Sequence, residues 1–219
     1  VFRTKNGSEF VQYIRLADSG VNDRIDFVNE VNWQSRGQLL KVAFPLRKGN
    51  PKATYDLSIG AIERGNNQEN LYEVAGHQWA DLSDEASGVS ILNDCKYGWD
   101  KPNNNTLRLT LIHTPSVNYT YQKDQDLGLN KFTYSVYGHE GKWSEDTQWA
   151  AASLNQPMLA FQAPKHAGAL GKSFGFVSLN TAKVAVKALK KAEDSDEMIV
   201  RVYELTGDTQ NDVELSFPT

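Results

Sequence analysis

The sequence has 219 residues, of which 40% are hydrophobic, and its formal net charge is −4 at pH 7. This length and composition are sufficient for one sizeable core, and no extended Lys/Arg stripe marks a nucleic-acid surface. No apolar run is long enough to cross a bilayer, and we expect no signal peptide. The single cysteine, Cys95, excludes an internal disulfide, and we expect a reducing, cytoplasmic compartment.

Four segments in the first third of the chain are rich in β-branched and aromatic residues, which favours β-strands. In the last of them, Tyr55, Leu57 and Ile59 share one strand face. In an earlier one, Arg24 and Asp26 indicate an ion pair within a packed sheet rather than a binding site. The four predicted strands cover residues 9–16, 24–33, 38–46 and 54–61.

The segment at 88–100, GVSILNDCKYGWD, is the most informative part of the chain. Its apolar beginning predicts the end of a buried strand, and the chain then turns polar at once, as when a rigid scaffold presents a site. Amides and carboxylates suit sugar hydroxyls, and aromatic faces suit the C–H side of a sugar ring. The alternative is a solvated loop whose aromatic residues cover the edge of the core. The candidate substrate-facing or interface residues are Asn93, Asp94, Lys96, Tyr97 and Trp99.

The second half of the chain continues as short strands with one helix. Alternation predicts strands over 106–113 and 131–137, and four further strands are predicted in the tail, over 173–179, 182–189, 198–205 and 213–217. A helix is predicted over 144–154, because Ser144 can cap it and acidic residues occupy its first turn. A dozen or so strands with one short helix indicate an all-β fold, a large antiparallel β-sandwich.

Several blocks of the sequence resemble the C-terminal region of the class II α-mannosidases, the zinc-dependent retaining glycoside hydrolases that cut α-linked mannose. The blocks follow the same order as in that family and cover almost the whole chain. They are RIDFVNEVNW, LLKVAFPL, ATYDLSIGAIER, ADLSD, GVSILNDCKYGWD, TLRLTLIHTP, KFTYSVYGHEG, SLNQPML and VAVKALKKAEDSDEMIVRVYEL.

The resemblance implies a mutarotase-like super-sandwich and a single domain over residues 1–219, forming most of the C-terminal domain of a longer α-mannosidase. The sequence from Val1 onward resembles the interior of a domain and not its beginning, which indicates an excised or processed fragment. In the family, the aspartate nucleophile and the zinc ion belong to an N-terminal barrel-like catalytic domain, and its motifs are absent from this chain.

The resemblance therefore implies that the parent enzyme hydrolyses terminal α-mannosides with zinc, and that this chain alone is inactive. The implied partners are the missing catalytic domain of the same polypeptide and a mannose-containing oligosaccharide, with no nucleic acid and no membrane. A homo-oligomer remains open. The chain would then serve as scaffold, as domain interface and as a substrate-facing wall.

No catalytic or metal site is predicted within the chain itself. The four histidines, His77, His113, His139 and His166, are scattered and form no H-x-x-x-H or H-x-D ligand pair. Cys95 has no base partner in the sequence, and we expect a small buried residue there.

Two acidic groups are interpreted as loops. Asp81, Asp84 and Glu85 form either a carboxylate cluster or an ordinary polar loop, and we favour the loop. The loop with Asp124 and Asp126 lacks the glycine and the terminal glutamate of a calcium-binding loop, so we expect it to be solvated.

Two other functional classes stay open from the residues alone. One is a free-standing carbohydrate-binding module with an aromatic platform at Trp99, Tyr97 or Tyr121. The other is a purely structural or oligomerising domain, for which a large bare apolar patch would be evidence. Saturable binding of mannosides by the isolated chain would favour the carbohydrate-binding module.

Overall fold

The computed structural model describes residues 1–16, 23–115 and 125–218. The chain divides into two compact units, Val1–Gln156 and Pro157–Thr219, each described separately below. The expectation of one domain over 1–219 stays a prediction.

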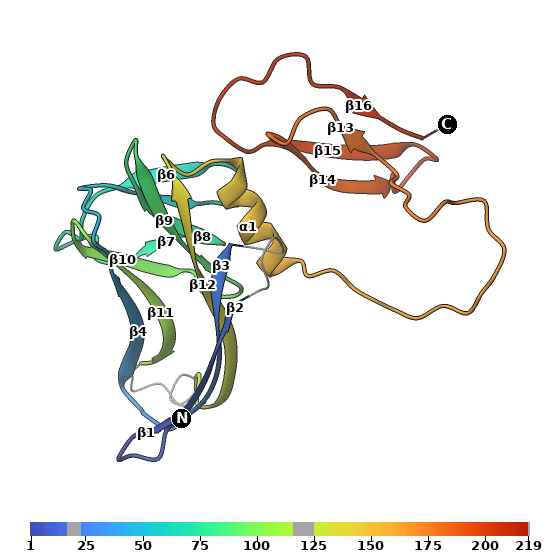
Figure 1. Cartoon of the computed structure of the whole chain (residues 1–219). Helices are drawn as coiled ribbons and strands as arrows, with labels where there is room; N and C mark the ends of the chain where they lie inside the picture. The colour runs from blue at the N-terminus through green and yellow to red at the C-terminus, as the bar shows by residue number, and fades with distance from the viewer. Residues whose placement is uncertain (17–22, 116–124, 219) are drawn as a thin grey trace. The chain divides into compact units, whose positions relative to one another are not determined.

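The first unit contains a large antiparallel sheet and a smaller one (Figure 1). In spatial order the large sheet comprises β1 (Phe2–Arg3), β2 (Glu9–Leu16), β3 (Arg24–Trp33), β12 (Gly128–Glu140), β9 (Ser87–Asn93), β8 (Trp79–Ser83), β5 (Ala53–Asp56) and β6 (Ala61–Arg64). The small sheet comprises β4 (Gln38–Pro45), β11 (Thr106–Thr114), β10 (Gly98–Asn103) and β7 (Val74–Ala75).

The core of this unit lies between the two sheets, as the alternation of apolar residues predicts. In β11, Leu107, Leu109 and Leu111 are buried, whereas Arg108 and Thr110 lie on the opposite face. They pack in one cluster with buried residues of the large sheet, among them residues of β8, β9 and β12. The predicted all-β sandwich is therefore confirmed, and the strands predicted over 9–16 and 24–33 agree with β2 and β3 in both bounds.

The strand predicted over 54–61 is wrong as one element, because the chain reverses in its middle. The Leu57 amide donates to the Gly60 carbonyl at 3.0 Å, and Gly60 has a φ of +93°, which favours glycine. The two arms are β5 and β6, paired with each other. As a result, Tyr55 is buried whereas Ile59 is 80% exposed at the turn.

The one helix of the described residues, α1 (Glu145–Asn155), covers the face of the large sheet that points away from the small sheet. Ser144 is its N-cap and accepts a hydrogen bond from the Asp146 amide, as predicted. Ala151 packs with Trp79 and Leu92 in a second buried cluster. In the described ranges, no helix is long and apolar enough to cross a membrane.

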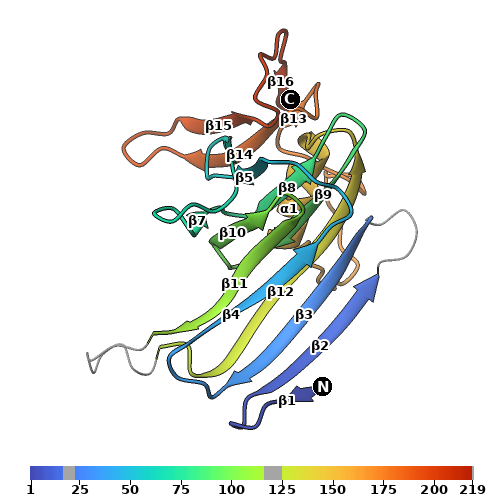
Figure 2. The same cartoon turned by 90° about the vertical axis from the view of Figure 1, so that its left-hand side faces the viewer.

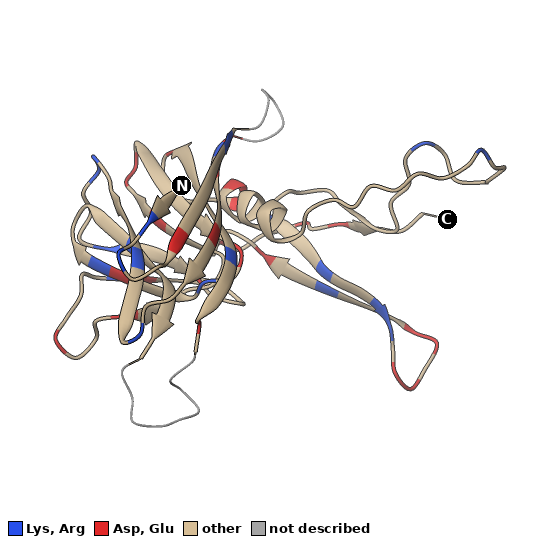
Figure 3. Ribbon diagram, turned by 90° about the horizontal axis from the view of Figure 1, so that it is seen from below, with Lys and Arg blue, Asp and Glu red and all other residues tan. Residues whose placement is uncertain are grey.

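The second unit is small and built from two strand pairs. One pair joins β14 (Val184–Lys191) to β15 (Met198–Glu204), and the other joins β13 (Ser178–Leu179) to β16 (Leu215–Ser216). The turn between β14 and β15 carries acidic residues, and both strands carry basic residues (Figure 3). The strand predicted over 173–179 is mostly wrong, because only its last two residues pair.

Candidate functional site

The candidate loop after β9 is held in place by the side chain of Asn93. This residue is 1% exposed, its amide donates to the His77 carbonyl at 2.7 Å, and its amide oxygen accepts from the Lys96 backbone N–H at 2.6 Å. At the end of α1, Asn155 donates to the Asn93 carbonyl at 3.0 Å. The Asn93 amide is thus committed to shaping the loop and is not available to a ligand.

Asp94 and Lys96 flank the turn and contact β12. The Asp94 carboxylate accepts from the Thr133 amide at 2.9 Å, and the Asp94 amide donates back to the Thr133 carbonyl at 3.2 Å. The Lys96 ammonium lies 4.9 Å from the centre of the Phe132 ring, close enough for a cation–π interaction. Both side chains are half-buried, and both have roles in pinning the loop.

Tyr97 and Trp99 point to opposite environments. Trp99 is 0% exposed, lies edge-on to Tyr55, and donates its indole N–H to the Gly76 carbonyl at 3.3 Å. Tyr97 is 58% exposed and lies edge-on to His77. Of the two platform candidates that the structure describes, Tyr97 alone is exposed, because Trp99 belongs to the core.

Cys95 is exposed, which corrects the expectation of a buried residue. Partial desolvation together with the neighbouring Asp94 carboxylate raises the pKa of its thiol to about 12. A thiol with so high a pKa is almost entirely protonated at neutral pH and is a poor nucleophile.

A polar cluster that spacing did not predict lies buried beneath the start of α1. The His139 imidazole Nε2 lies 2.7 Å from Asp81 Oδ2, and the Ser90 hydroxyl donates to the same oxygen at 2.8 Å. Ser83 donates to the other Asp81 oxygen, and Thr147 of α1 lies beside Ser90. The favoured interpretation of Asp81 as a loop residue is wrong, because it lies in β8 and is 1% exposed.

This cluster resembles a nucleophile–base–acid set in composition but not in geometry. Ser90 is 0% exposed and donates to Asp81, and its Oγ also lies 3.2 Å from His139 Nε2. That same nitrogen contacts Asp81 at 2.7 Å, whereas a catalytic triad places the acid and the nucleophile on different ring nitrogens. Gly88 closes the site further, because a Cβ atom there would lie 2.4 Å from the His139 ring and 2.3 Å from Ser83 Cβ. The cluster therefore joins three strands to α1 and does not present a reactive group.

A second charged network lies on the outer face of the small sheet. The Asp100 carboxylate is fully buried between the Lys41 ammonium, at 2.7 Å, and the Arg108 guanidinium, at 2.6 Å. Glu73 pairs with Lys41, and the Tyr72 hydroxyl accepts from Arg108 at 2.7 Å. Each charge has a counter-charge, as is typical of a structural network.

Lys101 is 1% exposed, and among the described residues no carboxylate forms an ion pair with it. Its ammonium donates to three carbonyl oxygens: the Asn50 backbone at 2.6 Å, the Asn66 side chain at 2.6 Å and the Asn103 backbone at 2.9 Å. Burial lowers the pKa of Lys101 to about 8. It is therefore still mostly charged at neutral pH, and it ties the end of β10 to the loops at Asn50 and Asn66.

Metal ligands do not converge within the described ranges, where no three His, Cys, Asp or Glu side chains come together. His113 is exposed at the end of β11, and its amide donates to Asp126 at 3.0 Å. Asp124 and Tyr121 lie outside the described residues.

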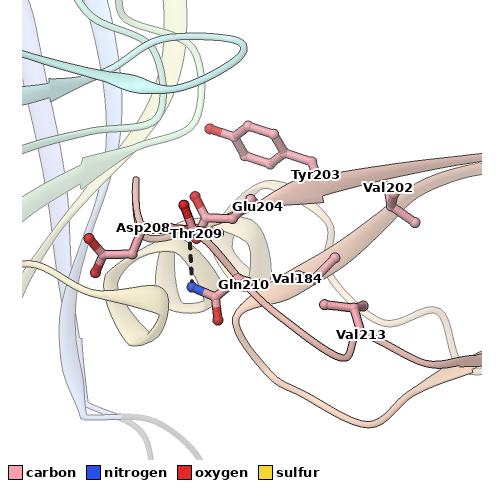
Figure 4. Close-up of a pocket in the computed structure, with 8 residues that line it drawn as sticks. All are labelled: Val184, Val202, Tyr203, Glu204, Asp208, Thr209, Gln210 and Val213. Carbon is pink, nitrogen blue, oxygen red and sulfur yellow. Dashed lines mark hydrogen bonds between the residues drawn. The ribbon is translucent and has the colours of Figure 1, made fainter.

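The second unit contains an open pocket of about 290 Å³, whose valine side chains form an apolar side opposite polar residues (Figure 4). The Glu204 carboxylate accepts from the Thr206 and Gly207 amides, at 2.6 and 2.7 Å, which lowers its pKa even though burial opposes this. Gln210 donates to the Asp208 carbonyl at 3.2 Å. The pocket is lined by Val184, Val202, Tyr203, Glu204, Asp208, Thr209, Gln210 and Val213.

Two family descriptions match the chain. Residues 1–120 match "Glycosyl hydrolases family 38 C-terminal domain", and residues 183–219 match "Glycosyl hydrolases family 38 C-terminal beta sandwich domain". The first match alone covers more than half of the 219 residues.

The similar curated proteins are called α-mannosidases. Identity is 33% over 192 residues with alpha-mannosidase 2C1 of Homo sapiens, and 35% over 191 residues with alpha-mannosidase G of Dictyostelium discoideum. Each alignment covers 84% of this chain but only 18% and 17%, respectively, of the relative. The alpha-mannosidase of Saccharomyces cerevisiae is 30% identical, and the alignment covers 94% of this chain and 21% of the relative.

A solved structure of an alpha-mannosidase from Enterococcus faecalis V583 has the same fold. The TM-score is 0.79 at 21% identity, and the match covers 90% of this chain and 23% of that one. The chain thus spans about a fifth of the length of the proteins it matches.

Proposed function

Because this chain belongs to the family of glycosyl hydrolase family 38 C-terminal domains, we propose that it works as the non-catalytic part of a longer α-mannosidase that hydrolyses terminal α-mannosides. The observation that carries the proposal is the family match over residues 1–120, together with relatives that are all called α-mannosidases.

The chemistry of the chain supports a scaffold role. Retaining glycoside hydrolysis needs two accessible carboxylates on either side of the scissile bond. Asp81 and Asp100 are the buried carboxylates of the two polar networks, and each is already paired with cationic or hydroxyl partners. Neither is available to a sugar.

A zinc ion is expected in the parent enzyme, but the described residues of this chain offer no ligand set for it. We therefore assign zinc to the catalytic part of the polypeptide and derive no step through it here. The catalytic part and a mannose-containing oligosaccharide are the proposed partners, and the cytoplasm is the proposed compartment.

Within this chain, the loop that begins at Asp94 is the proposed contact with the sugar or with the catalytic part. The Asn93 side chain and the hydrogen bonds of the Asp94 amide and carboxylate to the Thr133 backbone fix the loop, which exposes the ring of Tyr97. A fixed loop loses little conformational entropy when a partner binds.

The test is hydrolysis of an aryl α-mannoside by the 219-residue chain and by the longer polypeptide that contains it, each with and without added zinc. We expect turnover only from the longer polypeptide. Zinc-dependent turnover by the chain alone would show that a complete active site lies within these residues, and no turnover from the longer polypeptide would refute the activity.

Carbohydrate binding without hydrolysis is the second candidate function. For this function, the pocket at Asp208 and Gln210 is a better candidate binding site than the loop that begins at Asp94. That pocket combines an apolar floor with carboxylate, amide and hydroxyl groups, the set that recognises a sugar ring. Saturable NMR shifts of Asp208 and Thr209 with methyl α-mannoside, absent in Gln210→Ala, would support this candidate.

A further inference from the structure

Strand β2 forms an outer edge of the large sheet and has almost no neighbour on one side (Figure 2). Its inner side pairs with β3 over its whole length, from Glu9 to Leu16. On its outer side only β1 pairs with it, at Phe2↔Phe10 and Arg3↔Glu9. Among the described residues, the edge over 11–16 therefore has no strand partner.

The same stretch exposes large apolar side chains. Tyr13 is 51% exposed, Ile14 is 63% exposed and Leu16 is 74% exposed. A long, flat, apolar edge strand is a template for pairing, and proteins normally protect such edges with proline, lysine or a bulge. Residues 11–16 contain one charged residue, Arg15, but no proline and no lysine, and their register with β3 is continuous.

Two of these side chains belong to the core face of the sheet. Phe10 packs against the core, and Gln12 donates to the Tyr134 hydroxyl at 2.9 Å, so the face that carries Phe10 and Gln12 points inward. Side chains alternate along a strand, so Ile14 and Leu16 lie on that same inward face. An inward-facing residue that is more than half exposed indicates that part of the opposing layer is missing.

The small sheet does not supply this cover. The small sheet covers β12, where the ring centre of Phe44 in β4 lies 5.5 Å from that of Tyr134. In the part of the chain that the structure describes, it has four strands against the eight of the large sheet, and its edge strand β4 pairs only with β11. The apolar strip of Ile14 and Leu16 is thus a continuation of the core that lies beyond the small sheet.

We propose that the 11–16 edge of β2 receives a further β-strand from the part of the parent polypeptide outside these 219 residues, and that this segment also covers Ile14 and Leu16. This rests on the proposed function, because it requires the longer polypeptide. Three observations favour that occupant: the relatives are several times longer than the chain, the strip is continuous with the core, and backbone pairing with alternate apolar side chains suits an added strand.

The decisive comparison uses one substitution in two settings. Ile14→Lys, made in the longer polypeptide, should lower the melting temperature by several degrees, because the lysine would be buried against the added strand. In the 219-residue chain the same substitution should leave the melting temperature unchanged and increase solubility. Ile59→Lys is the matched control, because Ile59 is 80% exposed at the β5–β6 turn, and it should have no effect in either setting.

Amide hydrogen exchange of the unmodified proteins provides a measurement that does not depend on a variant folding. Alternate amides of 11–16 point away from β3 and should exchange quickly in the chain but slowly in the longer polypeptide. Equal exchange in both, or equal effects of Ile14→Lys in both, would overturn the proposal. So would a dimer of the 219-residue chain that Ile14→Lys dissociates, since a second copy would then occupy the edge. Mannoside hydrolysis is measured separately, so loss of the proposed function would not be mistaken for loss of this interface.

Discussion

His139 Nε2 and Asp81 Oδ2 lie 2.7 Å apart on the helix-covered face of the large sheet, although the two residues are 58 positions apart in the chain. The side chains are 8% and 1% exposed, respectively. Ser90, on the strand between them, donates to the same carboxylate. One buried pair thus fixes β8, β9 and β12 together beneath α1.

Removing the charge of Asp81 should therefore be costly. Asp81→Asn would leave the imidazolium of His139 without its counter-charge in a buried site, and loss of one partner of such a pair typically costs about 3 kcal/mol of unfolding free energy. Urea unfolding of the chain measures this loss. Glu85→Gln is the matched control, because Glu85 is 86% exposed and its pair with Lys142 lies at the surface, so the midpoint should not move. Equal midpoints for both variants would contradict a stabilising role of the buried pair.

The same pair predicts how stability depends on pH. Burial disfavours the charged imidazole, but the hydrogen bond and charge of Asp81 outweigh it and raise the pKa of His139 above the ordinary 6.5. A raised folded-state pKa means that the stabilisation is complete below 6.5 and is lost as the pH rises through the folded-state value. The difference in unfolding free energy between the wild type and His139→Gln should therefore shrink as the pH rises above about 6.5. Both proteins contain the other histidines, so the difference in unfolding free energy cancels their titration. A difference that widens as the pH rises would contradict the assignment of this pH dependence to His139.

The strand pattern was predictable where alternation and turn residues agree. The strands β2, β3 and β11 follow their apolar periods, whereas the 54–61 segment alternates in the same way yet contains a reversal at Gly60. Alternation describes faces and does not detect a tight turn whose residues happen to keep the period. The second unit was harder, because two-residue strands such as β13 carry no period at all.

The candidate site was only partly predictable, because register decides which loop residues face inward. Trp99 lies opposite Leu109 in the β10–β11 pair, and cross-strand partners share a face, so its burial follows from that pairing. The pairing of Asp81 with His139 depends on the order β8–β9–β12, which spacing along the chain does not reveal. The roles of Asp94, Lys96 and Tyr97 toward a sugar or a partner stay predictions.

Trp99 and Tyr97 should respond in opposite ways to truncation. Trp99→Ala removes a fully buried indole and its hydrogen bond to Gly76, which should cost about 3–5 kcal/mol and lower the melting temperature sharply. Tyr97→Ala removes a half-exposed ring and should change stability by about 0.5 kcal/mol or less. In the longer polypeptide, however, Tyr97→Ala should lower kcat/KM for a mannoside or weaken domain association. A Tyr97→Ala enzyme with unchanged kinetics and unchanged association would remove this residue from the proposed contact surface.

Lys101 should be intolerant of replacement by an apolar residue of similar length. Lys101→Met leaves the carbonyl oxygens of Asn50, Asn66 and Asn103 without their shared donor. A buried polar group without a hydrogen-bond partner costs about 1–3 kcal/mol of unfolding free energy unless water replaces the partner. Lys96→Met is the control, since it removes a cation–π contact with Phe132 and should cost about 1 kcal/mol or less.

Because burial lowers the pKa of Lys101 to about 8 from 10.5, the folded state binds fewer protons than the unfolded state between those values. The unfolding free energy of the wild type should therefore contain a contribution from Lys101 that rises with pH across this range. The unfolding free energy of Lys101→Met, measured by urea titration, should lack this contribution. If the unfolding free energy of Lys101→Met has the same slope against pH as that of the wild type, the titrating group is not Lys101.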